Sequence, residues 1–341
     1  MSRTADEPRE SAELLAFLSD PQSYPGEPAT RVEIRETHMS RVFLTDRFAY
    51  KLKKRVRLPF LDLTRLEARR RNCESELRLN RRLADWVYLA VVAVTRESDG
   101  RLALGGDGEP VDYLVKMRRL AEALMLDHRL AALEGPSEIA PVARHLSRFL
   151  ARSPAAERNI ERHLTALARE ITLDVSTLAK PADSLPRPLV SRALGALFEN
   201  FARMRPQLAR RVAAGHIIDA HGDLRPEHVY LGAPPAIIDC LEFSRRLRLR
   251  DRIDEIAFLG LECRRLGRGE VGLWFREVYE KEAGERPDDA LYAFYAGFRA
   301  VQRARLAVWH AADPEPRAAA HWYARARRYL ELAVEEFARC R

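Results

Sequence analysis

The chain carries the sequence His221-Gly-Asp-Leu-Arg-Pro-Glu-His-Val-Tyr-Leu231, and Ala236-Ile-Ile-Asp239 follows a short distance downstream. Gly222 allows a sharp backbone turn, which places Asp223 on a loop rather than in a core. Two short runs of strand-forming residues flank Gly232-Ala-Pro-Pro235, a pattern typical of a hairpin. Folding back at this turn is expected to bring Asp239 beside the loop that carries Asp223 and His228. Two carboxylates and an imidazole brought together in this way suit metal-assisted phosphoryl transfer.

This combination resembles the catalytic core of the aminoglycoside phosphotransferase-type kinases, small-molecule relatives of the protein kinases. In that family a metal ligand lies five residues after the aspartate of His-Gly-Asp, and an apolar-apolar-Asp sequence follows. Three further segments are similar to a largely uncharacterised bacterial branch of the superfamily: residues 37–40, 50–54 and 58–62. The resemblance covers roughly residues 10 to 335.

The resemblance implies an α+β fold of the bilobal, protein-kinase-like type, with a β-rich N-lobe and a helical C-lobe. The residue pattern predicts a helical extension and linker over 1–30, an N-lobe over 31–117, and a helical C-lobe over 118–341 that contains the catalytic loop 221–239. The N-lobe is expected to be an antiparallel sheet with one helix, residues 64–84, capped by Asp62 or Thr64. Its predicted strands are 32–35, 41–44, 48–52, 89–95, 102–104 and 111–116. The predicted C-lobe helices are 136–151, 163–173, 188–214, 251–266, 272–283, 287–312 and 318–339.

A lysine near the end of the third predicted strand is the candidate ATP-binding cation. Strand alternation places Lys51 and Lys53 on one face and Lys54 on the other. The family position selects Lys51, and the resemblance implies that its ammonium group contacts the α- and β-phosphates of ATP. The alternative is an ordinary surface lysine.

A glutamate of the N-lobe helix is expected to hold this lysine. Glu67, Glu74 and Glu76 are available, and the resemblance favours Glu76 because it precedes the last apolar turns of the helix. An exposed helix glutamate without such a role is the alternative.

Two other features concern the nucleotide. The turn between the first two strands is Thr37-His-Met-Ser40 and contains no glycine-rich loop, so backbone amides and the Thr37 or Ser40 hydroxyl are the groups left to hold phosphate. Met117 stands where the family has its adenine-binding hinge, and methionine suits an adaptable apolar slot. A plain core position is the alternative for Met117.

The resemblance also implies roles for the residues of the catalytic loop. Asp223 is expected to orient the substrate hydroxyl and accept its proton, and Asp239 to bind the Mg²⁺ that accompanies ATP. His221 is expected to pack and hydrogen-bond the loop, and Asp254 to support it. A capping or surface role is the alternative for Asp254.

His228 departs from the family, which has asparagine at this position. Imidazole suits softer ions such as Mn²⁺ or Zn²⁺ better than Mg²⁺. Three interpretations are open: His228 binds Mn²⁺ or reaches Mg²⁺ through water, or a second metal site is lost, or the protein binds nucleotide with little turnover. Glu242, three residues after Asp239, is a candidate for supplying the missing oxygen ligand.

Two functions therefore remain. The first is an ATP-dependent phosphotransferase acting on a hydroxyl of a small molecule. The second is a pseudokinase-like module that binds nucleotide or docks a partner. A protein kinase is less well supported, since no Ala-Pro-Glu ends an activation segment. Some members of the resembling branch carry a P-loop kinase domain. This sequence contains no Gly-x₄-Gly-Lys-[Ser/Thr], and a separate P-loop kinase is a candidate partner.

The composition, with a formal net charge of +8, limits the possible partners. Arginines cluster at 69–71, 245–250 and 325–328, but acidic residues are interleaved with them, so we expect solvated helix faces rather than nucleic-acid binding. A basic chain also disfavours polycationic aminoglycosides as substrates.

The four cysteines lack Cys-x-x-Cys spacing and are expected to be reduced thiols of a cytoplasmic protein. Neither a membrane span nor a targeting peptide is predicted.

Overall fold

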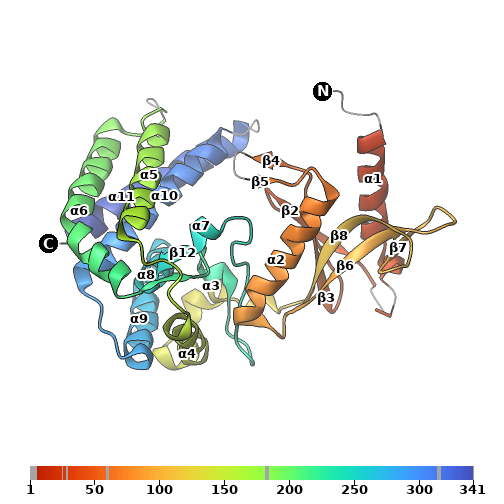
Figure 1. The fold of residues 1–341 in the computed structure, drawn as a ribbon, viewed down its shortest axis with the longest axis horizontal. Coiled ribbons are helices and arrows are strands. Elements are labelled where there is room, and N and C mark those ends of the chain that lie inside the picture. The colour runs from red at the N-terminus through yellow and green to blue at the C-terminus, as the bar shows by residue number, and fades with distance from the viewer. Residues whose placement is uncertain are drawn as a thin grey trace. The chain divides into compact units, whose positions relative to one another are not determined.

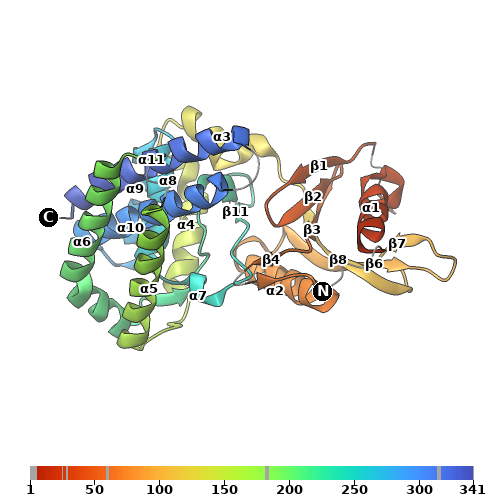
Figure 2. The ribbon, with the colours of Figure 1, turned by 90° about the horizontal axis from the view of Figure 1, so that it is seen from above.

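The computed structural model describes residues 6–24, 26–27, 30–58, 61–180, 184–312 and 316–340, which form two compact units (Figures 1 and 2). A sheet unit consists of the residues up to Glu122 together with Ala236–Ser244. A helical unit consists of Ala123–Pro235 and the residues from Arg245 onwards. Pro59 and Phe60, which belong to the resembling segment 58–62, and parts of the predicted extension and linker lie outside the described residues.

The sheet unit is built on six strands in the order β1-β2-β3-β8-β6-β7, and all neighbouring pairs are antiparallel. The six predicted strands are confirmed, with ends shifted by at most two residues. The strands are β1 (Glu33–Glu36), β2 (Ser40–Leu44), β3 (Phe48–Lys53), β6 (Tyr88–Arg96), β7 (Leu102–Leu104) and β8 (Glu109–Arg118). The unit also contains α1 (Asp6–Ser19), η1 (Pro21–Ser23), β4 (Arg57–Leu58), β5 (Leu61–Asp62), α2 (Leu66–Ala84), η2 (Glu122–Leu124) at its boundary, and β11 (Ala236–Ile237).

The two helices α1 and α2 cover opposite faces of this sheet (Figure 1). Because side chains alternate along a strand, β3 serves both faces. Tyr50 packs with Leu18 of α1 in one hydrophobic cluster. Lys51 and Lys53 point to the other face, where both reach Glu76 of α2.

The start of α2 differs from the prediction that Asp62 or Thr64 caps it. The N-cap residue is Arg65, whose side chain makes no capping hydrogen bond. Asp62 Oδ1 instead accepts hydrogen bonds from the amide and hydroxyl groups of Thr64, at 3.0 and 2.6 Å. A short acidic side chain can bind nearby backbone donors outside a helix. Here the Asp62 carboxylate binds Thr64 in the turn before the helix and is not available as a helix cap.

The helical unit confirms the seven predicted helices. They are α4 (Pro136–Arg152), α5 (Ile160–Leu178), α6 (Arg187–Ala213), α8 (Arg252–Arg265), α9 (Gly269–Ala283), α10 (Asp289–Ala311) and α11 (Pro316–Ala338). Shorter elements are α3 (Leu126–Arg129), η3 (Leu130–Ala132), η4 (Pro226–His228), β10 (Val229–Tyr230) and α7 (Arg245–Arg248). The two short runs of the predicted hairpin are thus strands β10 and β11, and the boundary between the units falls between them.

One antiparallel strand pair, β9 (Ile217–Asp219) with β12 (Leu249–Asp251), was not predicted. Strand β9 lies just before the predicted catalytic loop and β12 directly before α8, so the pair brings these two segments together. Asp251 ends β12 and caps α8 by accepting a hydrogen bond from the amide of Ile253. Among the described residues, none of the helices has the length and apolar character needed to cross a membrane.

Helix α10 is the central helix of this unit, and most of its side chains are buried. It packs most extensively against α11 and also contacts α5, α6 and α8. The approach to α11 is close at Gly297, where a Cβ atom would lie 2.6 Å from the ring of Phe337. This position therefore excludes larger residues and lets α10 pack closely against α11.

The prediction that the clustered arginines lie on solvated faces is wrong for Arg69, Arg248 and Arg250, which are at most 4% exposed. Each has a carboxylate partner that offsets its burial. The nearest nitrogen–oxygen distances are 2.9 Å for Arg69 to Asp112, 2.6 Å for Arg248 to Asp219 and 3.1 Å for Arg250 to Glu170.

Candidate active site

The sheet unit contains a chain of five alternating charges: Asp239, Lys51, Glu76, Lys53 and Glu242. Lys51 Nζ lies 2.6 Å from Asp239 Oδ1 and 2.8 Å from Glu76 Oε1. Lys53 Nζ contacts the other oxygen of Glu76 and lies 2.6 Å from Glu242 Oε1. The side chains of Glu76 and Lys53 are completely or almost completely buried. The structure therefore brings Lys51, Glu76 and Asp239 together and adds Lys53 and Glu242 to them.

The unfavourable effect of burying these charges is offset by the opposite charges beside them. Burial alone would lower the pKa of Lys51, but Asp239 and Glu76 raise it well above its ordinary value. Burial alone would raise the pKa of Glu76, but Lys51 and Lys53 hold it below its ordinary value. The ammonium and carboxylate groups consequently stay charged at neutral pH.

Asp239 is held in position by the backbone around it. Its φ angle is +63°, in the left-handed region that aspartate tolerates better than most residues. Its amide donates to the Tyr88 hydroxyl at 3.1 Å, and the amide of Cys240 donates to Asn80 Oδ1 at 2.8 Å. The side chain is 44% exposed, in contrast to the 13% of Lys51. Asp239 thus presents its carboxylate at the solvent end of the charge chain.

The remaining sequence candidates of the sheet unit lie close to β3. Met117 of β8 is 9% exposed and pairs with Ala49 of β3. In the turn that replaces a glycine-rich loop, the Ser40 amide donates to Thr37 Oγ1 at 3.0 Å, and the Thr37 hydroxyl donates to the Ser40 carbonyl at 3.1 Å. The Thr37 hydroxyl is therefore used to close the turn.

The helical-unit part of the predicted catalytic loop holds Asp223 among positive charges. Its Oδ2 accepts a hydrogen bond from Arg225 Nε at 3.0 Å, and its Oδ1 lies 4.0 Å from Arg303 Nη1. Burial alone would raise the pKa of Asp223, but Arg225 and other nearby positive groups lower it to about 2. The carboxylate is therefore ionised throughout the neutral range.

His228 supports this loop through both ring nitrogens. Its Nδ1 lies 2.8 Å from the carbonyl oxygen of Asp223, and its Nε2 lies 3.2 Å from Arg225 Nη2. Since a carbonyl only accepts and a guanidinium only donates, Nδ1 carries the proton and Nε2 accepts. In this conformation His228 orients Arg225 and the backbone of Asp223.

Residues that follow the predicted catalytic loop in sequence bind its backbone. Glu255 accepts hydrogen bonds from the amides of His221 and Gly222, both within 3.2 Å, and His221 is fully buried. Asp254 is buried and binds Arg299 at 2.6 Å, and Arg299 in turn donates to the Gly222 carbonyl at 3.2 Å. Asp254 therefore reaches the loop through Arg299, while Glu255 contacts it directly.

Sequence reasoning missed four residues of this loop environment: Arg225, Glu255, Arg299 and Arg303. Arg225 lies inside the quoted motif and Glu255 adjoins Asp254, so a charge count of these segments would have singled them out. Arg299 and Arg303 come from α10, and no local pattern marks them.

The donors present fit Mg²⁺ with nucleotide phosphates better than an all-protein metal site. Mg²⁺ usually takes one or two carboxylates and completes its shell with phosphates and water, which suits the exposed Asp239 carboxylate. Over the described ranges, no three His, Cys, Asp or Glu side chains are grouped so as to hold a metal ion. Glu242, considered as an extra metal ligand, is bonded to Lys53 instead. Lys51 offers the ammonium group for phosphate.

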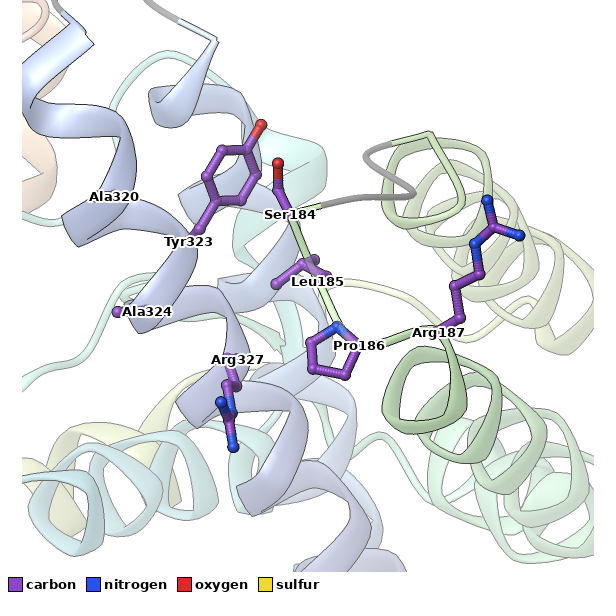
Figure 3. A pocket seen from close by; sticks show the side chains of 8 residues that line it. All are labelled: Ser184, Leu185, Pro186, Arg187, Ala320, Tyr323, Ala324 and Arg327. Carbon is purple, nitrogen blue, oxygen red and sulfur yellow. The ribbon is translucent and has the colours of Figure 1, made fainter.

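A cavity of about 670 Å³ lies elsewhere in the helical unit, between the start of α6 and one side of α11 (Figure 3). None of the sequence-predicted site residues lines it. Its lining residues are Ser184, Leu185, Pro186, Arg187, Ala320, Tyr323, Ala324 and Arg327.

Comparison with known proteins gives both sequence relatives and structural neighbours. No protein-family model matches the sequence. Uncharacterised proteins of Mycobacterium tuberculosis and Mycobacterium bovis are 34% identical over 311 residues, which are 89% of this chain and 59% of theirs. The chain thus spans less than two thirds of the length of these relatives.

The structural neighbours are small-molecule kinases. The GDP complex of aminoglycoside 2′-phosphotransferase-IIIa has a TM-score of 0.58 at 16% identity, covering 96% of this chain and 98% of that one. A related complex with GDP and kanamycin has a TM-score of 0.56 at 17% identity, covering 97% and 99%. A choline/ethanolamine kinase family protein from Mesorhizobium loti has a TM-score of 0.50 at 15% identity, covering 96% and 99%. The chain therefore has the fold of the aminoglycoside phosphotransferase and choline kinase-like structural family.

Proposed function

We propose that the protein is an ATP-dependent phosphotransferase that acts on a hydroxyl group of a small molecule. The observation that carries this proposal is the linkage of Lys51 to both Glu76 and Asp239, on the same fold as known small-molecule kinases. A lysine fixed between a buried glutamate and an exposed aspartate is suited to hold nucleotide phosphates beside a divalent cation.

In the proposed reaction the γ-phosphoryl group passes to the acceptor hydroxyl oxygen, and a nucleoside diphosphate leaves. Asp223 accepts the hydrogen bond of that hydroxyl and takes its proton. A carboxylate with a pKa of about 2 is a weak base, so orientation of the hydroxyl is its main contribution. A strong base is not needed for phosphoryl transfer, because the transition state of this reaction is loose.

Each remaining site residue has a role in this reaction. Lys51, kept in place by Glu76, binds phosphate oxygens, and Met117 lines the adenine slot. Asp239 holds the metal ion, which supplies electrostatic stabilisation of the phosphate charge when bound. His221, His228 and Asp254 keep the catalytic loop in place; direct metal binding by His228 would first require it to release Arg225 or the Asp223 carbonyl.

The alternative is a pseudokinase-like module, and one observation favours it. The histidine at the family's metal-ligand position is engaged at both ring nitrogens. A module of this kind would bind nucleotide or a partner with little turnover. The relatives are longer than the region they share with this chain, so a P-loop kinase domain remains a candidate partner.

The subcellular location and the nucleotide are part of the same proposal. All four cysteines are buried and free, which agrees with a reducing cytoplasm. Structural neighbours have been solved with GDP, so GTP is to be tested beside ATP.

Thermal melting with ATP or GTP, with Mg²⁺ or Mn²⁺, tests the proposal on wild type, Asp239→Asn and Asp223→Asn. A nucleotide at about 100 times its dissociation constant stabilises the folded state by about 2.7 kcal/mol. We expect Asp239→Asn to lose the metal-dependent part of the shift. Asp223→Asn should keep it but lose turnover about 10²- to 10⁴-fold. The absence of any shift in wild type would refute nucleotide use, and a shift without turnover for any acceptor would favour the alternative.

A further inference from the structure

An arginine cluster surrounds the ring of Tyr329 in the helical unit. It consists of Arg265 from α8, Arg303 from α10 and Arg325 from α11. Their guanidinium carbon atoms lie 5.7, 5.8 and 5.9 Å from the ring centroid. Tyr329 itself is fully buried, so its ring forms a rigid support for three positive groups.

Glu262 is the carboxylate that faces this cluster, and it is shared. It accepts the Tyr329 hydroxyl at 2.6 Å and Arg265 Nε at 2.8 Å, while Arg303 Nε stays 3.6 Å away. Its side chain has no solvent exposure. Glu262 thus pairs closely with Arg265 and only at longer range with Arg303.

Arg325 is the least compensated member. Over the described part of the chain it makes neither a hydrogen bond nor an ion pair, and its contacts are the rings of Trp322 and Tyr329. Contact with an aromatic face orients a guanidinium group and leaves its N–H donors unused. The side chain is only partly exposed, so its position is defined by packing.

The arginines closer to the catalytic loop backbone already bind groups of the protein through all three of their guanidinium nitrogens. Arg225 binds Asp223, Glu227 and His228, and Arg299 binds Asp254, Glu255 and the Gly222 carbonyl. One member of the arginine cluster, Arg303, also lies near Asp223. Arg303 connects the two, since its Nη1 lies 4.0 Å from Asp223 Oδ1.

We infer that the arginine cluster binds an anionic group of the acceptor, so that the substrate is a hydroxylated small molecule bearing a phosphate or a carboxylate. Guanidinium groups match the planar, bidentate geometry of these anions. Because Arg303 lies 4.0 Å from Asp223, an anionic group bound at Arg303 would lie close to the hydroxyl that is phosphorylated. A polycationic acceptor would instead be repelled. This inference rests on the proposed function, which supplies the role of Asp223.

Inorganic phosphate is the first probe, with its binding measured by calorimetry on wild type, Arg325→Gln and Arg327→Gln. Arg327 is the matched control. It lies two positions after Arg325 on α11, so its side chain points to a different side of the helix, and it lines the cavity of Figure 3. It is 61% exposed and pairs with Glu331. We expect Arg325→Gln to bind phosphate about 10- to 100-fold more weakly and Arg327→Gln to match wild type within about twofold. Thermal melting without ligand checks that both variants fold.

The same titration with saturating ADP and Mg²⁺ distinguishes two sources of the anion. Phosphate binding that persists with ADP assigns the cluster to the acceptor. Competition by ADP would assign the cluster to the nucleotide phosphates and overturn the inference. Equal phosphate binding by wild type and Arg325→Gln, or none by wild type, would also overturn it. The nucleotide-dependent melting shift is measured separately, so the proposed function can stand while the inference fails.

A panel of matched acceptors provides the second readout. Each hydroxylated compound is tested with and without a phosphate or carboxylate group, and nucleoside diphosphate release is followed. We expect higher kcat/KM for the anionic member of each pair. Arg325→Gln should raise its KM about tenfold or more with a smaller change in kcat, and Arg325→Lys should restore part of it. Preference for neutral or cationic members would contradict the assignment.

Discussion

Lys53 Nζ lies 2.6 Å from Glu242 Oε1, and these side chains are only 1% and 7% exposed. Glu76 binds Lys53 on one carboxylate oxygen and Lys51 on the other. The second lysine therefore fixes the orientation of the glutamate that holds the first. It also ties the segment that carries Asp239 to the sheet, because Glu242 lies three residues after Asp239.

Lys53→Met is expected to destabilise the protein by about 3–5 kcal/mol, because Glu242 would be left as a buried charge without its partner. The free energy of unfolding is measured with urea. Lys53→Met/Glu242→Gln removes both members of the pair and should be more stable than the sum of the single changes implies, by about 1 kcal/mol or more. Strict additivity would show that the contact contributes no coupling.

Lys51→Met is expected to lower kcat/KM about 10²-fold or more, since it removes the ammonium group proposed to bind the phosphates. Lys54→Met is the matched control, because it changes the charge equally three residues further on, where Lys54 pairs with Glu36. The control should retain activity within about twofold. Equal losses in both variants would point to a general charge effect and remove the assigned role of Lys51.

Arg225→Gln is expected to raise the pKa of Asp223 from about 2 toward its ordinary value, since Arg225 is the main group that lowers it. A raised pKa means that the carboxylate is protonated, and activity lost, at a higher pH. The acid limb of kcat/KM should therefore move from about pH 2 toward about pH 4. Arg245→Gln, a change at an exposed arginine of α7, should leave the limb in place. An unchanged limb in Arg225→Gln would assign it to another group.

Glu255 should make the stability of the protein depend on pH. Burial raises the pKa of Glu255 to about 7. The Arg299 guanidinium opposes part of this increase, and the neighbouring Asp254 carboxylate adds to it. Between about pH 4.5 and pH 7 the folded state then binds more protons than the unfolded state, so the Glu255 contribution to stability falls as the pH rises.

The difference in unfolding free energy between wild type and Glu255→Gln isolates this contribution. We expect wild type to lose a few kcal/mol relative to the variant between about pH 5 and pH 8. Glu277→Gln, at an exposed position of α9, is the matched control for the loss of one carboxylate. A pH-independent difference for Glu255→Gln would mean that Glu255 is ionised throughout.

Local sequence patterns were sufficient to predict the strands and helices, because these depend on the spacing of residues close together in the chain. Alternation along β3 placed Lys51 and Lys53 on one face, and helical periodicity located the long helices of the helical unit. The family resemblance supplied Asp223, Asp239 and Glu76, whose roles remain predictions.

Contacts between distant segments could not be read from the sequence. Arg303 and Tyr329 belong to separate helices, and only the packing of α10 against α11 brings them together. The burial of Arg250 depends in the same way on Glu170, which lies 80 residues earlier. For such arginines the sequence shows the positive charge but does not show which distant carboxylate pairs with it. The prediction that these arginines lie on solvated helix faces was therefore wrong.

The return of residues Ala236–Ser244 to the sheet unit affects how the chain can acquire its structure. A nascent chain that ends at Glu122 contains Lys51, Lys53 and Glu76 but neither Asp239 nor Glu242. Two lysines would then share one carboxylate in a setting that buries them. The sheet unit is consequently completed only after more than a hundred further residues have been synthesised, and contacts of such high sequence separation slow folding. Its assembly is thereby coupled to the synthesis of most of the helical unit, and a fragment cut at residue 122 would lack the partners that its charges require.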